Sequence, residues 1–205
     1  MAKIGILGGS FHPFHNGHLM LGQYCLDKKL VKEVWFIPTG VSYLKSGKKM
    51  LSGSERLRLL NLGIEDRPNM QALDIEINRP GNTYTIDTIK ELQSLYPEHE
   101  FYFIIGADCL FSMEFWYRAD EIFSSCHLLV ARRDGKSRYE MRLKAKDLKE
   151  RFGAKIRILE FQEMDISSTM IRERIKSGKP TEDLLPGKIA EEIRKKGYFS
   201  ETENE

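Results

Sequence analysis

The chain has 205 residues, of which 41% are hydrophobic and 30% are charged, a composition typical of one globular domain. Its formal net charge of +2 is too small to indicate a nucleic-acid-binding protein. No apolar segment approaches the roughly 20 residues that would span a bilayer, and the first residues show no targeting signal. The three cysteines lie far apart in apolar surroundings without a CxxC pair, so we interpret them as reduced thiols of a cytoplasmic protein.

Strands and helices are predicted to alternate along the chain. Apolar, β-branched runs predict buried strands over 3–7, 33–38, 101–105, 127–131 and 155–161, and an alternating pattern predicts another over 72–77. Helical spacing of apolar residues predicts a first helix after an N-cap at Asn16, and others over 54–65, 83–95, 116–123, 138–152, 168–176 and 188–196. This alternation predicts an α/β, Rossmann-like doubly wound fold: a mainly parallel sheet with helices on both faces and a small C-terminal helical part. We expect one domain over 1–199 and a disordered tail over 200–205.

A glycine turn with two histidines follows the first predicted strand. Residues 8–18 read GGSFHPFHNGH and lead into the first helix. Gly8 and Gly9 let the backbone turn and bring its amides to an anion, and the helix start adds the positive end of its dipole. His15 and His18 are three residues apart and share one face of the first helical turn. We interpret this segment as a phosphate-binding cradle.

Other interpretations of the same segment are weaker. The chain contains neither a Walker A sequence nor a GxGxxG fingerprint after the first strand. Histidines at 12, 15 and 18 suggest zinc, but the first lies in the loop and no acidic or cysteine ligand completes the set at the usual spacing. Surface histidines in a turn are another interpretation. That interpretation would suit a single histidine, but it explains the pair His15 and His18 less well. We therefore expect no metal ligands from the protein.

A second polar segment lies at the start of a later helix. Residues 165–172 read DISSTMIR, and hydroxyl side chains at a helix start are common caps. Ser168 and Arg172 also place a guanidinium one helical turn from exposed backbone amides, an arrangement suited to a polyphosphate. Taken alone, the segment leaves both interpretations open.

These segments resemble signatures of the nucleotidylyltransferase superfamily. Residues 8–18 match (T/S)xxHxxH in the form GGSFxPxHxGH, 166–172 match ISSTxIR, and TYTIDT at 83–88 is similar to SYTxDT. Together they resemble the bacterial nicotinate-nucleotide adenylyltransferases over nearly the whole chain. The resemblance implies an enzyme of NAD biosynthesis that transfers AMP from ATP to nicotinate mononucleotide, giving nicotinate adenine dinucleotide and pyrophosphate.

The resemblance also implies roles for individual residues. Those expected to act in catalysis are His15, His18, Lys45 and Arg172. Those expected to contact ATP are Gly8, Gly9, Ser10, Phe11, His15, His18, Gly106, Asp108, Ile166, Ser167, Ser168, Thr169 and Arg172. Those expected to contact the mononucleotide are Lys45, Thr83, Tyr84, Thr85, Trp116 and Arg133. Amides near Tyr84 and Thr85 are expected to meet the pyridine carboxylate, and the Trp116 indole is expected to stack on the ring.

Two departures from the family pattern leave alternatives open. His12 stands where the family has Asp or Asn, and the family's PPHK has no histidine counterpart in VSYLK at 41–45, although Lys45 keeps the cation. Arg56 is a weaker candidate for a phosphate contact. The acceptor could instead be nicotinamide mononucleotide or pantetheine phosphate, although a helix start suits a carboxylate better than a neutral amide. The departures also permit a nucleotide-binding regulator without catalytic activity.

The expected chemistry needs no protein nucleophile. The mononucleotide phosphate is already an anion and attacks the α-phosphorus of ATP in line, so catalysis comes from alignment and surrounding cations. Mg²⁺ is expected to be bound through ATP phosphates and water. We expect two small-molecule substrates as partners, without nucleic acid or membrane, and leave a homo-oligomer open. The long, lysine-containing loop over 39–53 is expected to be functional.

Overall fold

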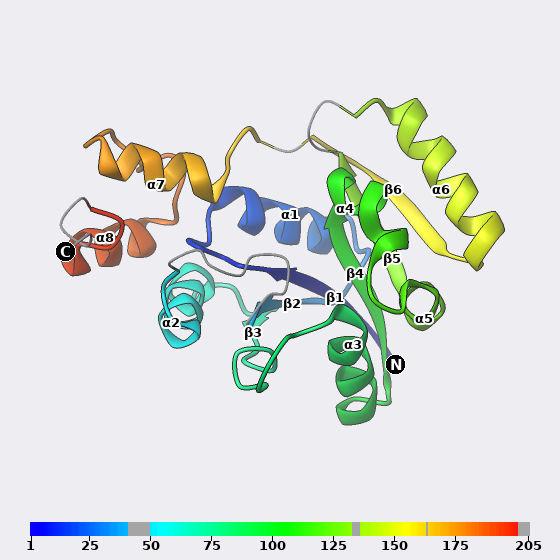
Figure 1. Ribbon diagram of the computed structural model, residues 1–205. Helices are drawn as coiled ribbons and strands as arrows, with labels where there is room; N and C mark the ends of the chain where they lie inside the picture. Colours follow the sequence, from blue (N-terminus) through cyan, green and yellow to red (C-terminus); the bar gives the residue numbers. More distant parts are fainter. Residues whose placement is uncertain (41–49, 133–135, 163, 201–205) are drawn as a thin grey trace.

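The computed structural model describes residues 1–40, 50–132, 136–162 and 164–200 (Figure 1). Within these residues the strands form one parallel sheet in the order β3-β2-β1-β4-β5-β6. The strands are β1 (Ala2–Gly9), β2 (Glu33–Pro38), β3 (Met70–Ala72), β4 (His99–Gly106), β5 (His127–Arg132) and β6 (Lys155–Gln162). The strand order reverses between β1 and β4, at the centre of the sheet. This arrangement confirms the predicted doubly wound α/β fold, and every pairing is parallel.

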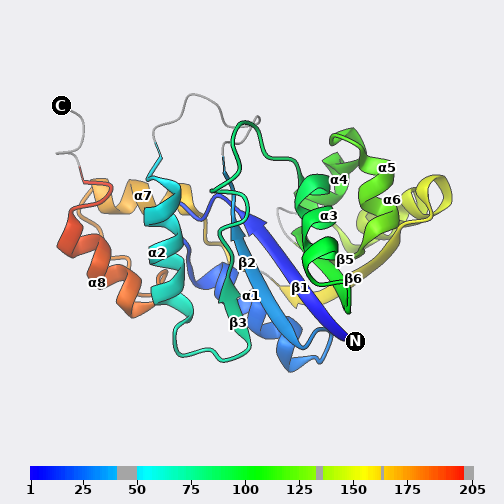
Figure 2. The same ribbon diagram turned by 90° about the horizontal axis from the view of Figure 1, so that it is seen from below.

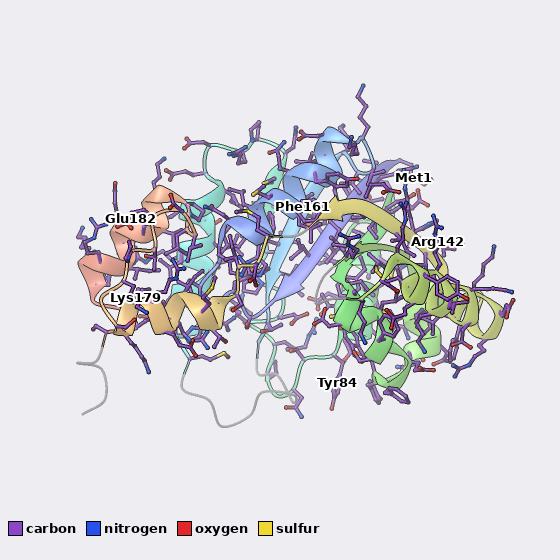
Figure 3. All side chains as sticks on the ribbon, turned by 90° about the horizontal axis from the view of Figure 1, so that it is seen from above. Met1, Tyr84, Arg142, Phe161, Lys179 and Glu182 are labelled. Atoms are coloured by element: carbon purple, nitrogen blue, oxygen red, sulfur yellow. The ribbon has the colours of Figure 1, made fainter. Side chains whose placement is uncertain are left out.

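Helices cover both faces of the sheet. One face carries α1 (Asn16–Asp27), α2 (Gly53–Ile64), α7 (Ser168–Lys176) and α8 (Gly187–Lys196). The other carries α3 (Thr85–Leu95), α4 (Ala107–Ser112), the 3₁₀ turn η1 (Met113–Phe115), α5 (Ala119–Ser125) and α6 (Arg138–Phe152). In Figures 1 and 2, α8 lies beside α2 at the opposite end of the sheet from α6. Figure 3 shows the same separation, with Lys179 and Glu182 between α7 and α8 and Arg142 on α6. The two C-terminal helices thus form the predicted small helical part.

The central strands divide their side chains between two cores. In β2, Val34 and Phe36 pack with the helices of the α1 face, whereas Trp35 and Ile37 pack with those of the α3 face. This division follows from the two-residue period of a strand, and it explains why consecutive residues 34–37 of β2 are all apolar. None of the helices in the described part of the chain is long and apolar enough to cross a membrane.

Two predicted elements are wrong. Residues 73–77 are not a strand: β3 ends at Ala72, and a turn follows in which the Asn78 amide donates to the Asp74 carbonyl at 3.1 Å. The helix predicted over 116–123 begins at Ala119, because Trp116 ends the η1 turn and Arg118 has a left-handed φ of 54°. The structure also adds α4, a helix of 6 residues that is too short to show a helical period. The predicted tail over 200–205 lies outside the described residues except for Ser200.

Candidate active site

Helix α1 begins directly beyond the end of β1, with its two histidines side by side. The N-cap is His15, so the predicted cap at Asn16 is one residue late. The His15 backbone amide donates to Nδ1 of His18 at 3.3 Å, and the two imidazole centroids are 3.7 Å apart in a stacked arrangement. His15 is buried and His18 is half-buried. The expected shared face of these histidines is therefore present, and His18 is the more accessible of the two.

The start of α7 packs against the segment that precedes α1. The hydroxyl of Ser168 donates to the Pro13 carbonyl at 2.9 Å, and Nη1 of Arg172 donates to the His12 carbonyl at 2.7 Å. Two segments about 155 residues apart in sequence are thus in direct contact. Arg172 is half-buried beside this turn. Burial lowers the pKa of its guanidinium, and the nearby Glu173 carboxylate partly offsets that shift.

The remaining residues of the second segment have separate positions. Ser167 is the N-cap of α7, and its hydroxyl accepts from the Met170 amide at 3.1 Å. Nη2 of Arg172 donates to the exposed Thr169 hydroxyl at 3.1 Å. The Ile166 side chain is buried in the core, so only its backbone is placed to meet a ligand. The structure therefore confirms the helix cap at Ser167, whereas Ser168 and Arg172 contact the turn before α1 and polyphosphate binding stays a prediction.

A cavity of about 200 Å³ lies at the carboxyl ends of β1 and β2. Its lining includes Gly8, Gly9, Ser10, Thr83, Thr85 and Trp116. Residues predicted for the ATP side and for the mononucleotide side therefore share one cavity. His15, His18 and Arg172 are not among the lining residues.

Trp116 lines this cavity, and Tyr84 lies at the start of α3. The half-buried Trp116 indole meets Phe103 edge to face, with ring centroids 6.4 Å apart. Tyr84 is the N-cap of α3, and its ring lies 4.6 Å from that of Tyr117. Figure 3 shows Tyr84 well separated from Met1, which marks the start of β1. These positions bring aromatic rings and the N-terminus of α3 to the same end of the sheet.

The other predicted site residues are placed as follows. Gly106 is the N-cap of α4, and Asp108 is exposed in its first turn. The Phe11 side chain is 1% exposed and packs against His18, so a contact to ATP would have to come from its backbone. Lys45 and Arg133 lie outside the described residues.

Two buried charged residues have roles that sequence analysis missed. Arg56 is 3% exposed, and its guanidinium donates to three backbone carbonyls, so its side chain is not presented to a phosphate as expected. Glu76 is 8% exposed and lines the cavity. Burial lowers the pKa of Arg56 and raises the pKa of Glu76. No role was predicted for Glu76, and no motif in the sequence marks it as buried.

The site is rich in cations and hydroxyls and poor in metal ligands. In the described ranges, no group of three or more His, Cys, Asp or Glu side chains is placed to hold a metal ion. All three cysteines are free, and burial raises the pKa of Cys25 and of Cys126 to about 12. This donor set suits a polyanionic ligand better than a bare divalent cation.

The fold and the site define a class of protein. The sheet is parallel, and its strand order reverses at the centre. A glycine turn and helix N-termini lie at the carboxyl ends of its strands. These features define a Rossmann-like nucleotide-binding domain. The profile of the cytidylyltransferase-like family matches residues 6–174.

Similar proteins narrow that class. The chain is 37% identical over 199 residues to the probable nicotinate-nucleotide adenylyltransferase of Lachnoclostridium phytofermentans, a match that covers 97% of this chain and 100% of that protein. It is 33% identical over 202 residues to the nicotinate-nucleotide adenylyltransferase of Bacillus subtilis, covering 97% and 99%. Plasmodium falciparum nicotinic acid mononucleotide adenylyltransferase complexed with APC shares the fold, with a TM-score of 0.79, 18% identity and coverage of 97% and 98%. The chain therefore belongs to the cytidylyltransferase-like family and, within it, to the nicotinate-nucleotide adenylyltransferases.

Proposed function

We propose that the chain transfers AMP from ATP to nicotinate mononucleotide, a step of NAD biosynthesis, at the carboxyl ends of β1 and β4. The observations that carry this proposal are the contact of Ser168 and Arg172 at the start of α7 with the turn before α1, and the cavity lined by Ser10, Thr85 and Trp116. Relatives named for this activity match almost the full length of the chain, which supports the same substrates here.

On the donor side, the triphosphate lies between the two helix starts. The backbone amides at both N-termini and the dipoles of α1 and α7 favour an anion there. His18 and Arg172 add side-chain donors, and a guanidinium can bind phosphate oxygens in a fork. Lys45 is proposed to add a cation near the reacting phosphate, and Asp108 to accept from the ribose hydroxyls of ATP.

On the acceptor side, nicotinate mononucleotide occupies the cavity. Its pyridine ring lies against Trp116, because an electron-poor ring is attracted to the electron-rich face of an indole. Its carboxylate meets backbone amides at the start of α3, near Tyr84 and Thr85, where the helix dipole favours a negative charge. Arg133 is proposed to face the nucleotide. This environment selects nicotinate over nicotinamide, whose amide carries no charge.

The transfer is an in-line displacement. An oxygen of the mononucleotide phosphate forms a bond to the α-phosphorus, the bond from that phosphorus to the bridging oxygen breaks, and pyrophosphate leaves with the electron pair. His18 and Arg172 stabilise the negative charge that develops on the phosphoryl oxygens. Holding both phosphates in one geometry lowers the barrier further, because their translational and rotational entropy is already lost on binding, before the chemical step.

Mg²⁺ fits this site as a companion of ATP. The described residues offer imidazole, guanidinium and hydroxyl groups rather than a carboxylate cluster, so phosphate oxygens and water would hold the ion. When bound, it neutralises charge on the phosphates and helps pyrophosphate leave. The free thiols support an assignment to the reducing environment of the cytoplasm. We assign one domain to residues 1–199 and two small-molecule substrates as its partners.

Pyrophosphate release tests this proposal. Purified protein is incubated with ATP and MgCl₂ plus nicotinate mononucleotide, nicotinamide mononucleotide or 4′-phosphopantetheine, and pyrophosphate is measured for each acceptor. We expect kcat/KM for nicotinate mononucleotide to exceed the other two by at least about tenfold, the effect of roughly one lost charged contact. A faster reaction with either alternative would reassign the acceptor, and no release with any of them would support a regulator without catalytic activity.

A further inference from the structure

One peptide group beside the cavity is held from both sides by buried charges. The Thr39 carbonyl and the Gly40 amide belong to the same peptide group, directly after β2. The carbonyl accepts from Nη2 of Arg56 at 2.6 Å, and the amide donates to the Glu76 carboxylate. The cation faces the negative carbonyl end of the peptide dipole, and the anion faces its positive amide end. Each charge therefore strengthens the hydrogen bond that it makes.

Arg56 connects this peptide group to the rest of the site. Its Nη1 donates to the Ser10 carbonyl at 2.9 Å, and its Nε donates to the Leu51 carbonyl at 3.2 Å. One guanidinium therefore joins the glycine turn after β1 to both flanks of the 41–49 segment. The planar fork of an arginine suits this bridging, which a lysine ammonium could not reproduce in the same geometry.

Glu76 connects the same peptide group to the start of α3. Its Oε1 accepts from the Thr88 hydroxyl at 2.8 Å, and its carboxylate also accepts from the Thr83 side chain. The Thr88 hydroxyl in turn accepts from Nη1 of Arg79 at 3.0 Å. Thr39, Glu76, Thr83 and Thr88 all line the cavity, so this network forms part of its wall.

The packing around Gly40 leaves no space for adjustment. A Cβ added at Gly40 would lie 2.1 Å from the Glu76 carbonyl oxygen and 2.8 Å from Cγ2 of Thr83. The first of these atoms is backbone and cannot move aside as a flexible side chain would. The position of this peptide group relative to α3 is therefore set by close contact as well as by charge.

We propose that Arg56 and Glu76 are paired positioning residues, which fix the acceptor-side wall of the cavity by holding the Thr39–Gly40 peptide group between them. This inference rests on the proposed function of the cavity. Burying two charges is costly unless each is hydrogen-bonded and matched by an opposite charge, and here both conditions are met. Arg79 and Arg56 are the cations that interact with the Glu76 carboxylate. Neither member of the pair takes part in the chemistry; each acts through the residues it holds.

The two residues should have different kinetic signatures. Glu76 contacts only acceptor-side groups, so Glu76→Gln should raise KM for nicotinate mononucleotide about tenfold while kcat and KM for ATP change less than about twofold. Arg56 also holds Ser10, so Arg56→Lys should raise KM for both substrates by about tenfold. If the role were purely structural, the substitution would lower the amount of active protein and would not change one KM value more than the other.

The experiment combines these variants with one that alters no charge. Steady-state kinetics are measured with each substrate varied in turn, alongside the thermal midpoint and calorimetric binding of nicotinate mononucleotide. Gly40→Ala should raise the same KM as Glu76→Gln, because the added Cβ displaces the same peptide group. Matched controls are Glu150→Gln, which loses the surface pair with Lys146 on α6, and Arg58→Gln, which loses the surface pair with Glu192 on α8. Both controls should keep both KM values.

The outcomes separate this inference from the proposed function. If the wild-type protein releases pyrophosphate with nicotinate mononucleotide but folded Glu76→Gln and Gly40→Ala keep its KM, the positioning role is wrong and the function stands. Equal changes in kcat and both KM values that follow the thermal midpoint would also overturn the positioning role. A wild-type protein that neither binds nor uses this mononucleotide contradicts the proposed function instead.

Discussion

The donor and acceptor sides of the site are built in different ways. On the donor side, two helix starts meet through their own motif residues, with Ser168 and Arg172 donating to carbonyls of the turn before α1. On the acceptor side, the wall of the cavity depends on Arg56 and Glu76, which lie outside the predicted motifs and are almost fully buried.

This difference reflects the two ligands that we propose for the two sides. The donor side offers accessible charge to a ligand whose phosphates are the same in every nucleotide triphosphate. The acceptor side surrounds a particular ring and therefore needs fixed walls, which buried hydrogen bonds supply. Substitutions on the donor side should consequently reduce turnover, whereas those on the acceptor side should reduce affinity for one substrate.

The largest effect is expected at His18. His18→Ala should lower kcat on the order of 10²–10³ or more, because a preorganised donor to the developing charge is lost. Steady-state pyrophosphate release measures this, with circular dichroism to check the fold. His127→Ala, at the start of β5 and paired with Glu100, is the matched control and should keep its activity. Near-normal turnover of folded His18→Ala would refute the assignment of the phosphate cradle.

A smaller loss of turnover is expected at Arg172. Arg172→Ala removes the guanidinium that we propose binds the phosphates, together with its bond to the His12 carbonyl, so kcat should fall by about 10². Arg174→Ala, two residues along the same helix, loses only an exposed contact to the Pro180 carbonyl and should be neutral. Equal kinetics of the two variants would remove α7 from the donor side.

The acceptor side is tested at Trp116. Trp116→Ala should raise KM for nicotinate mononucleotide by about tenfold and leave KM for ATP nearly unchanged, since the ring contact contributes to binding of one substrate only. Trp116→Phe should recover part of the affinity, and Phe115→Ala, at a neighbouring exposed position, serves as the control. A fall in kcat with both KM values intact would mean that the indole does not contact the mononucleotide.

The smallest effect is expected at His12. Its Nδ1 accepts from the Leu51 amide at 3.4 Å, and its ring lies 4.9 Å from that of Phe199. A carboxylate can accept from the same amide, so His12→Asp should keep kcat/KM within about threefold. Loss of more than about tenfold, measured in the same assay, would show that the imidazole has a role that a carboxylate cannot fill.

Sequence analysis was most reliable where one local pattern decides the structure. The helices over 138–152 and 168–176 were predicted with the bounds that the structure has, because Ser137 and Ser167 are N-caps whose hydroxyls accept from the third residue of each helix. The five strands other than β3 were found from their apolar runs, because strands covered on both faces have few polar positions.

The errors arose where a local pattern was decided by distant contacts. Alternation over 72–77 resembles a half-exposed strand, yet Glu76 faces the cavity and is held by Thr88 and Gly40. Arg56, in the predicted helix over 54–65, was a weaker candidate for a phosphate contact. Its three carbonyl partners come from three separate segments, and no short window of sequence contains them.

A crystal structure with a non-hydrolysable ATP analogue tests the central claim most directly. The account predicts that the triphosphate lies between the starts of α1 and α7, with its oxygens within about 3.2 Å of the His18 imidazole and the Arg172 guanidinium. A triphosphate bound elsewhere, with either of these side chains directed away from it, would contradict the account.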